Sequence, residues 1–188
     1  MPKSIYKKGE LSEIVSLAQK GDVKALEELI KRVQKQIYAI FSHLITKKED
    51  VSDLTQEVLL KMARAIFSLK DLKKFKSWLD QIITNVFYDY VRKKNDNVIQ
   101  ISEEEFKELK DKIGCEPGEK CFFSELEKII NSAIMTLPFD FRITLVLREY
   151  EGLSYSDIAE ITNTTIGTVK SRIARARGIL QQKLKEFI

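Results

Sequence analysis

The sequence predicts an all-α protein of two small helical domains joined by a flexible linker. Apolar residues recur every three or four positions over most of the chain, and no segment shows the alternation of a strand. Only 7 of the 188 residues are glycine and 3 are proline, which suits helices because both residues break helix interiors. The periodicity fails over residues 95–124, where acidic residues bunch and Gly114, Pro117 and Gly118 interrupt any helix. This stretch is therefore the predicted linker.

The linker separates an N-terminal domain, residues 1–94, from a C-terminal domain, residues 125–188. In the first domain we expect helices over residues 11–20, 22–44, 51–67 and 77–94, with Asp22 as an N-cap. A lysine-rich loop, residues 70–76, precedes the fourth of these helices. Periodicity returns at Leu126, and the second domain is expected to hold four helices, with breaks at Pro138 and Gly152. One short helix, around residues 103–110, is expected inside the linker.

Composition argues against several functional classes. The single histidine and the two cysteines lack metal-ligand spacing, and no catalytic set or glycine-rich phosphate loop is present, so neither a cofactor nor an enzymatic activity is expected. Cys115 and Cys121 are expected to be plain thiols, with a redox switch as the alternative. The polar N-terminus and the lack of a long apolar run predict a cytoplasmic protein. The net charge of +4 permits nucleic-acid binding without requiring it.

The C-terminal domain carries the pattern of a helix-turn-helix. Ser154 and Asp157 form a capping-box pattern at the start of a short helix. A turn follows at Asn163, a residue that tolerates left-handed backbone angles, and a longer helix begins near Thr165. A short helix, a tight turn and a longer helix are typical of proteins that place the second helix in the DNA major groove.

The longer helix has one apolar and one polar side. At ~100° per residue, one side carries apolar residues and the opposite side carries hydroxyl and basic residues. The apolar side is formed by Val169, Ile173, Ala176, Leu180 and Leu184. The expected DNA-binding residues are Thr165, Gly167, Thr168, Lys170, Ser171, Arg172 and Arg175. Arg172, nearer the N-terminus, is the expected base contact and Arg175 the expected phosphate contact. In isolation these residues would be better explained as a solvated basic face, because such faces are common, but the capped helix and turn before them favour DNA binding.

The fourth helix of the N-terminal domain offers a second candidate surface. Amide, aromatic and cationic side chains on one of its faces suit single-stranded DNA, with lysines placed for phosphates. The residues expected to contact DNA are Lys73, Lys74, Lys76, Trp78, Gln81, Asn85, Tyr88, Arg92 and Lys93. A polar exposed face, with cations complementing the helix dipole, is an equally good interpretation of this segment alone. Acids at the start of the third helix either favour its dipole or form an electrostatic docking face.

These motifs together resemble the extracytoplasmic-function type of bacterial RNA polymerase sigma factors. Residues 53–58, Asp-Leu-Thr-Gln-Glu-Val, resemble the core-polymerase-binding signature of that family, and residues 75–79 with Ile82 and Asn85 resemble its promoter-melting segment. Residues 152–160 and 167–177 are similar to its C-terminal helix-turn-helix. The resemblance runs in the order of the family from about Leu26 to Leu184.

The resemblance implies a function and partners. It implies a region-2-like domain that docks on the clamp helices of the largest polymerase subunit through Asp50, Asp53, Leu54, Gln56 and Glu57, and that holds the melted −10 strand. It implies a region-4-like domain that reads the −35 element as duplex, further contact with the polymerase flap, and control by an anti-sigma factor. Two alternatives are a stand-alone helix-turn-helix regulator, which leaves residues 1–94 without a role, and a helical adaptor without DNA affinity.

Overall fold

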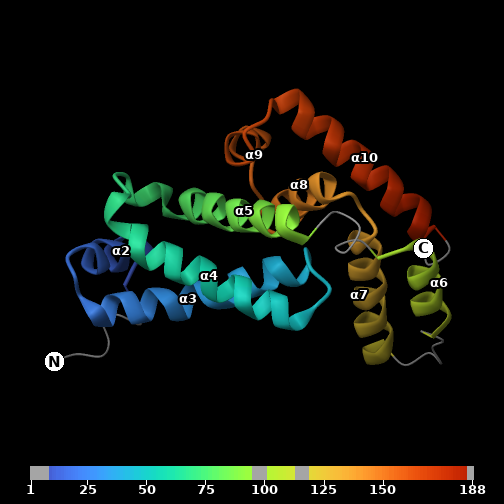
Figure 1. The fold of residues 1–188 in the computed structure, drawn as a ribbon, viewed down its shortest axis with the longest axis horizontal. Coiled ribbons are helices and arrows are strands. Elements are labelled where there is room, and N and C mark those ends of the chain that lie inside the picture. The colour runs from blue at the N-terminus through green and yellow to red at the C-terminus, as the bar shows by residue number, and fades with distance from the viewer. Residues whose placement is uncertain (1–8, 95–100, 113–118, 186–188) are drawn as a thin grey trace. The chain divides into compact units, whose positions relative to one another are not determined.

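The computed structural model describes residues 9–94, 101–112 and 119–185, and all regular structure in these residues is helical (Figure 1). The all-α expectation is confirmed. The chain divides into two compact units, one formed by residues 1–42 and 47–89 and the other by residues 43–46 and 90–188. Cys115 and the side chain of Cys121 lie outside the described residues.

The first unit is built from α2 (Leu11–Gln19), α3 (Val23–Ser42), α4 (Lys48–Ala65) and most of α5 (Phe75–Lys94). Two short 3-10 helices, η1 (Ile66–Ser68) and η2 (Leu72–Lys74), connect α4 to α5. Gly21 ends α2 with a positive φ of 85°, and Asp22 then caps α3 by accepting from the backbone N–H groups of Lys24 and Ala25. The expected cap at Asp22 is confirmed.

The core of the first unit comes from the apolar stripes of these helices. The buried side chains include Val15, Leu29, Ile37, Phe41, Val58, Met62 and Leu79. Helix α5 is buried over a wide arc, because Ile83 and Phe87 are fully buried in addition to Leu79 and Val86. Its exposed face is correspondingly narrow and polar.

The second unit contains α6 (Glu103–Lys112), α7 (Glu119–Met135), α8 (Phe139–Glu149), α9 (Tyr155–Ile161) and α10 (Ile166–Leu184). Its core includes Leu137, Ile143, Val146, Ile158, Val169 and Ile173. The short helix expected around residues 103–110 is present as α6, which packs against α7, and α7 begins at Glu119, inside the stretch expected as a linker. Burial of Phe106 and an ion pair between Glu103 and Lys183 of α10 tie α6 to the second unit.

Candidate nucleic-acid and polymerase interfaces

The turn before α10 has the geometry that its sequence predicts. The Ser154 hydroxyl accepts from the Asp157 backbone N–H, and the Asp157 carboxylate accepts from the Ser154 backbone N–H, which completes the capping box. Asn163 adopts the left-handed conformation with φ of 51°. Thr165 then caps α10 by accepting from the backbone N–H of Thr168 at 3.1 Å. A short capped helix, a tight turn and a long helix follow one another, as in a helix-turn-helix.

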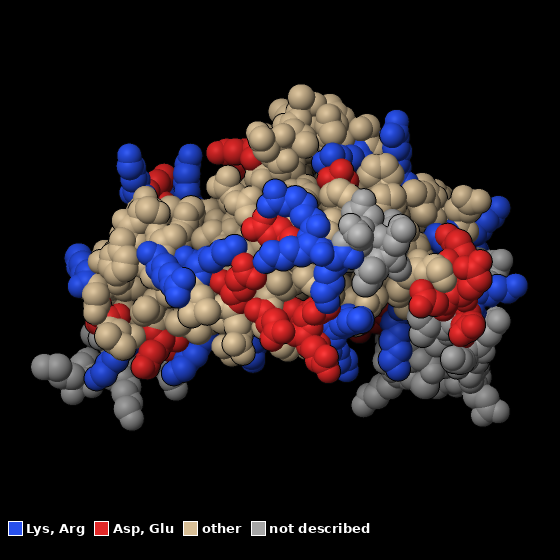
Figure 2. Space-filling view, in the orientation of Figure 1, with Lys and Arg blue, Asp and Glu red and all other residues tan. Residues whose placement is uncertain are grey.

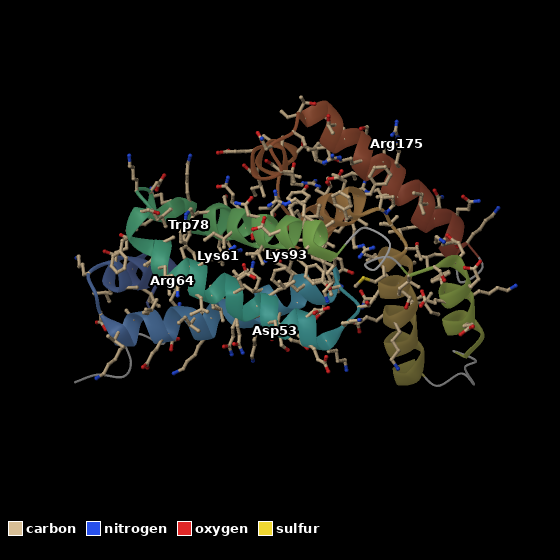
Figure 3. The ribbon with its side chains drawn as sticks, viewed as in Figure 1. Asp53, Lys61, Arg64, Trp78, Lys93 and Arg175 are labelled. Atoms are coloured by element: carbon tan, nitrogen blue, oxygen red, sulfur yellow. The ribbon has the colours of Figure 1, made fainter. Side chains whose placement is uncertain are left out.

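Helix α10 packs on α8 and α9 through Val169, Ile173 and Ala176, which are all buried. The predicted apolar side is confirmed at these three residues, whereas Leu180 and Leu184, predicted on the same side, are half-buried. The polar side carries the remaining groups, and Figure 3 shows Arg175 projecting outward from α10. A long helix fixed along one side leaves the opposite side available to a DNA groove.

The arginines of α10 divide into two classes that the sequence did not distinguish. Arg172 forms an ion pair with Asp140 of α8 at 3.0 Å, and its side chain is only 18% exposed. Arg177 forms an ion pair with Glu149, the last residue of α8, at 2.6 Å. These two arginines therefore hold α10 to α8. Arg172 was expected to contact a DNA base. In the structure its guanidinium is instead paired with the carboxylate of Asp140.

Arg175 forms the other class, and the lysine on the same helix, Lys170, is exposed in the same way. Both are exposed, and neither makes an ion pair with any residue in the described part of the chain. The hydroxyl groups nearby are partly engaged within the helix, because the Ser171 hydroxyl donates to the Thr168 backbone carbonyl at 2.9 Å. The cations that remain available for phosphate on this surface are thus Lys170 and Arg175.

A buried arginine connects two helices of the second unit. Arg142 of α8 is fully buried, and its Nη2 donates to the backbone carbonyls of Met135 and Leu137 at 2.6 and 2.9 Å. Burial disfavours the charged form and lowers the pKa of Arg142 to about 10. The two carbonyls that Nη2 binds lie at and just beyond the end of α7, where helix carbonyls lack partners of their own, and Nη1 donates to the Leu44 carbonyl at 2.7 Å. Arg142 thus joins the start of α8 to the end of α7.

Helix α5 presents the second candidate surface. Gln81, Asn85 and Arg92 are exposed, and Tyr88 is half-buried beside them. Lys73, Lys74 and Lys76 are exposed at the start of the helix, where the Asp71 carboxylate caps η2 by accepting from the Lys73 backbone N–H. Phe75 is buried and its ring lies 5.9 Å from that of Trp78, which is half-buried near the start of α5 (Figure 3). Aromatic, amide and cationic groups therefore line one helix, as base and phosphate contacts require.

Helix α4 presents the third candidate surface. Asp53 and Gln56 are exposed, and Glu57 pairs with Lys61 at 2.9 Å, while Lys61 also lies 3.7 Å from Asp89 of α5. Figure 2 shows basic and acidic side chains interleaved on the face of the molecule in view. Leu54, a member of the expected docking set, differs from its neighbours because its side chain is only 7% exposed and lies in the core of the first unit. Asp50 is half-buried at the start of the same helix.

The sequence interpretation missed the apolar residues of this surface. Leu60 is 58% exposed and Phe67, just beyond α4, is 64% exposed. They lie on the same side of the helix as Arg64, since residues three and four apart are neighbours on a helix surface. The sequence does contain a signal for this surface, because Leu60 falls outside the apolar stripe of Leu54, Val58 and Met62. Exposed apolar groups beside charged ones are typical of protein-binding surfaces.

Each described helix is too short or too polar to span a lipid bilayer. Among the described residues, no group of three or more His, Cys, Asp and Glu side chains is placed to hold a metal ion.

Comparison with known proteins identifies the class to which this fold and these surfaces belong. Residues 29–96 match the family model of sigma-70 region 2, and residues 127–180 match that of sigma-70 region 4. The two matches together cover more than half of the chain and occur in the order region 2, then region 4. The chain therefore belongs to the sigma-70 family of RNA polymerase sigma factors.

Similar proteins narrow the class to the extracytoplasmic-function (ECF) type that the sequence motifs indicated. The chain is 34% identical over 183 residues to the ECF RNA polymerase sigma-E factor of Haemophilus influenzae, covering 93% of this chain and 95% of that relative. It is 31% identical to the RNA polymerase sigma-H factor of Pseudomonas aeruginosa, covering 94% of each. Among solved structures, the sigma factor RpoE of Bartonella quintana, in complex with the anti-sigma factor NepR, matches with a TM-score of 0.66 and 29% identity over 87% of this chain and 98% of that chain.

Proposed function

We propose that this chain binds core RNA polymerase and directs it to promoters, with α4 as the docking helix, α5 as the holder of the melted −10 strand and α10 as the reader of the −35 duplex. The observation that carries the proposal is the presence of both sigma-70 regions in one chain, with a polar, partly cationic face exposed on a helix of each. The domain limits proposed for these roles are residues 1–94 and 125–188. The chain performs no chemistry in this scheme, and it acts in the cytoplasm, where the polymerase and DNA are.

Multi-round transcription with purified core polymerase and a promoter library tests the whole proposal. We expect initiation from a defined subset of promoters only when this chain is added. A stand-alone helix-turn-helix regulator would bind duplex DNA without supporting initiation by core polymerase, and a helical adaptor would do neither. Initiation that starts equally from all sequences would contradict the proposal.

An anti-sigma factor is the proposed regulator. The support is the Bartonella quintana sigma factor, which matches this chain over most of its length and was solved in complex with an anti-sigma factor. Leu60 and Phe67 beside the acids of α4 provide a surface on which such a partner would compete with polymerase. We therefore propose that polymerase and the anti-sigma factor exclude each other on α4.

If α4 is the docking helix, substitutions on its exposed acids should weaken polymerase binding without changing the stability of the chain. Changing Asp53 and Glu57 together to alanine should weaken core-polymerase binding about tenfold, because charge complementarity guides docking. The free energy of unfolding should change by less than about 0.5 kcal/mol, since exposed i,i+4 ion pairs such as Glu57–Lys61 contribute little. Titration with core polymerase and chemical denaturation measure the two quantities.

Glu27→Ala is the matched control, because Glu27 is an exposed acid on α3, outside the proposed surface. This variant should leave both binding and stability unchanged. A double variant that binds polymerase normally but unfolds far more easily would show that Asp53 and Glu57 serve the fold instead of docking.

The role of α5 predicts a preference for melted DNA. Asn85→Ala in the holoenzyme should weaken binding to a premelted −10 bubble by about three- to tenfold, the effect of losing one hydrogen bond. Binding to the closed duplex should stay unchanged, because its bases are not accessible to α5. Gln34→Ala, an exposed amide change on α3, is the control. Equal and negligible effects of Asn85→Ala on bubble and duplex would make this face an ordinary solvated surface.

A further inference from the structure

Ile166, the first residue of α10, exposes an apolar side chain at the end of the helix that is proposed to read DNA. The residue is 47% exposed, although its neighbours Val169 and Ile173 are buried. Single exposed apolar residues are common, so the exposure of Ile166 does not by itself indicate a binding role. Its position does, because the N-terminal residues of a recognition helix are the ones that reach base edges.

Apart from Lys170, the polar side chains in the first two turns of α10 are already engaged inside the protein. The Thr165 hydroxyl caps the helix at the backbone N–H of Thr168 and lies 2.9 Å from the Thr168 hydroxyl. The Ser171 hydroxyl donates to a backbone carbonyl, and Arg172 is bound by Asp140. Direct hydrogen bonding to bases at this end of α10 is therefore limited. Ile166 is apolar, so it can contact DNA without breaking a hydrogen bond inside the protein.

Gly167 supplies a second observation. A Cβ atom at this position would meet only the Thr165 hydroxyl oxygen, at an ordinary 3.7 Å, so nothing inside the protein requires glycine here. Glycine weakens a helix relative to alanine, and its presence in the first turn therefore brings no intramolecular benefit. Its effect is to leave an open surface beside Ile166, where the edge of a base pair can approach the helix closely.

We propose that Ile166 packs against the 5-methyl group of a thymine in the major groove, so that the chain selects thymine at one position of its −35 element. Thymine alone presents a methyl group in the major groove, and apolar side chains are the groups that recognise it. Lys170 and Arg175, exposed on the same helix, supply the attraction to phosphate that brings the helix into the groove. The inference rests on the proposed role of α10.

Uracil substitution tests this inference directly, because uracil pairs as thymine does and lacks only the methyl group. The probe is the promoter duplex that the wild-type holoenzyme selects from a library randomised in the −35 element, with each thymine in that element replaced singly by uracil. At one position the wild type should bind the uracil duplex about fourfold more weakly, the effect of burying one methyl group. Ile166→Ala should bind both duplexes at that weaker level and no longer distinguish them.

Two further variants sharpen the test. Val23→Ala removes a similar apolar group that is 68% exposed on α3, and it should keep the full preference for thymine. Gly167→Ala should weaken binding to thymine and uracil duplexes alike, because the added methyl group fills the open surface.

The inference is overturned if the selected element contains no thymine, if the wild type binds thymine and uracil duplexes equally at every position, or if Ile166→Ala keeps the preference. In each of these cases sequence-selective binding persists and the proposed function stands. A wild-type holoenzyme that selects no −35 sequence at all would overturn the reading role of α10 together with the inference.

Discussion

Replacing Arg142 with leucine should destabilise the second unit by about 2–4 kcal/mol, because a buried carbonyl that loses its donor retains the full cost of its desolvation. The Leu137 carbonyl accepts from Arg142 at 2.9 Å, and leucine offers no donor in its place. The Met135 carbonyl contributes less to this loss of stability, since it keeps a hydrogen bond from the backbone N–H of Ile101. Because leucine is apolar and suits a buried site, the loss of stability in this variant comes from the missing hydrogen bonds.

Hydrogen–deuterium exchange of the full chain measures this effect locally. We expect faster exchange of the amides in α8 and α10, with those in α3 as the internal reference. Arg175→Leu is the matched control, because it removes an arginine from an exposed position without ion pairs in the described residues. Unchanged protection of α8 in Arg142→Leu would mean that the α7–α8 junction does not depend on this guanidinium.

The elements that the sequence predicted well are those that local chemistry determines. The cap at Asp22, the capping box at Ser154 and the left-handed Asn163 each depend on a few adjacent residues, and all three are present in the structure. The apolar side of α10 was equally clear, because Val169, Ile173 and Ala176 recur at helical spacing. Local hydrogen bonding and a single helical period were sufficient for these elements.

The features that the sequence did not reveal depend on residues far apart in the chain. Arg172 and Arg175 look alike on a helical wheel, and only the packing of α8 shows that Asp140 binds the first and leaves the second exposed. Likewise, the short helix predicted around residues 103–110 is present as α6, but its packing against α7 and the start of α7 at Glu119 were not predicted, because the acidic, glycine-interrupted sequence has a weak apolar pattern. Their attachment rests on individual contacts such as Phe106 and Glu103, which no local pattern marks.

The division of the arginines in α10 predicts opposite behaviour for two substitutions of the same kind. Arg175→Ala should weaken binding to the −35 duplex for all sequences alike and lower the salt slope by about one, as the loss of one phosphate contact does. Its free energy of unfolding should stay within about 0.5 kcal/mol of the wild type, because the residue is exposed. Salt-dependent titration of the holoenzyme and chemical denaturation measure these effects.

Arg172→Ala should instead reduce stability, by about 1 kcal/mol, because it removes a partly buried ion pair that holds α10 on α8. Asp140→Asn separates stability from DNA contact, since it breaks the same ion pair and leaves the guanidinium in place. If Arg172 serves the fold, Asp140→Asn and Arg172→Ala should show similar losses of stability, and the double variant should lose little more than either. If Arg172 contacts a base, Arg172→Ala should relax selectivity at one base pair with unfolding unchanged, and Asp140→Asn should retain that selectivity. The structure favours the first outcome, because a guanidinium bound to Asp140 must exchange that carboxylate for a base before it can read one.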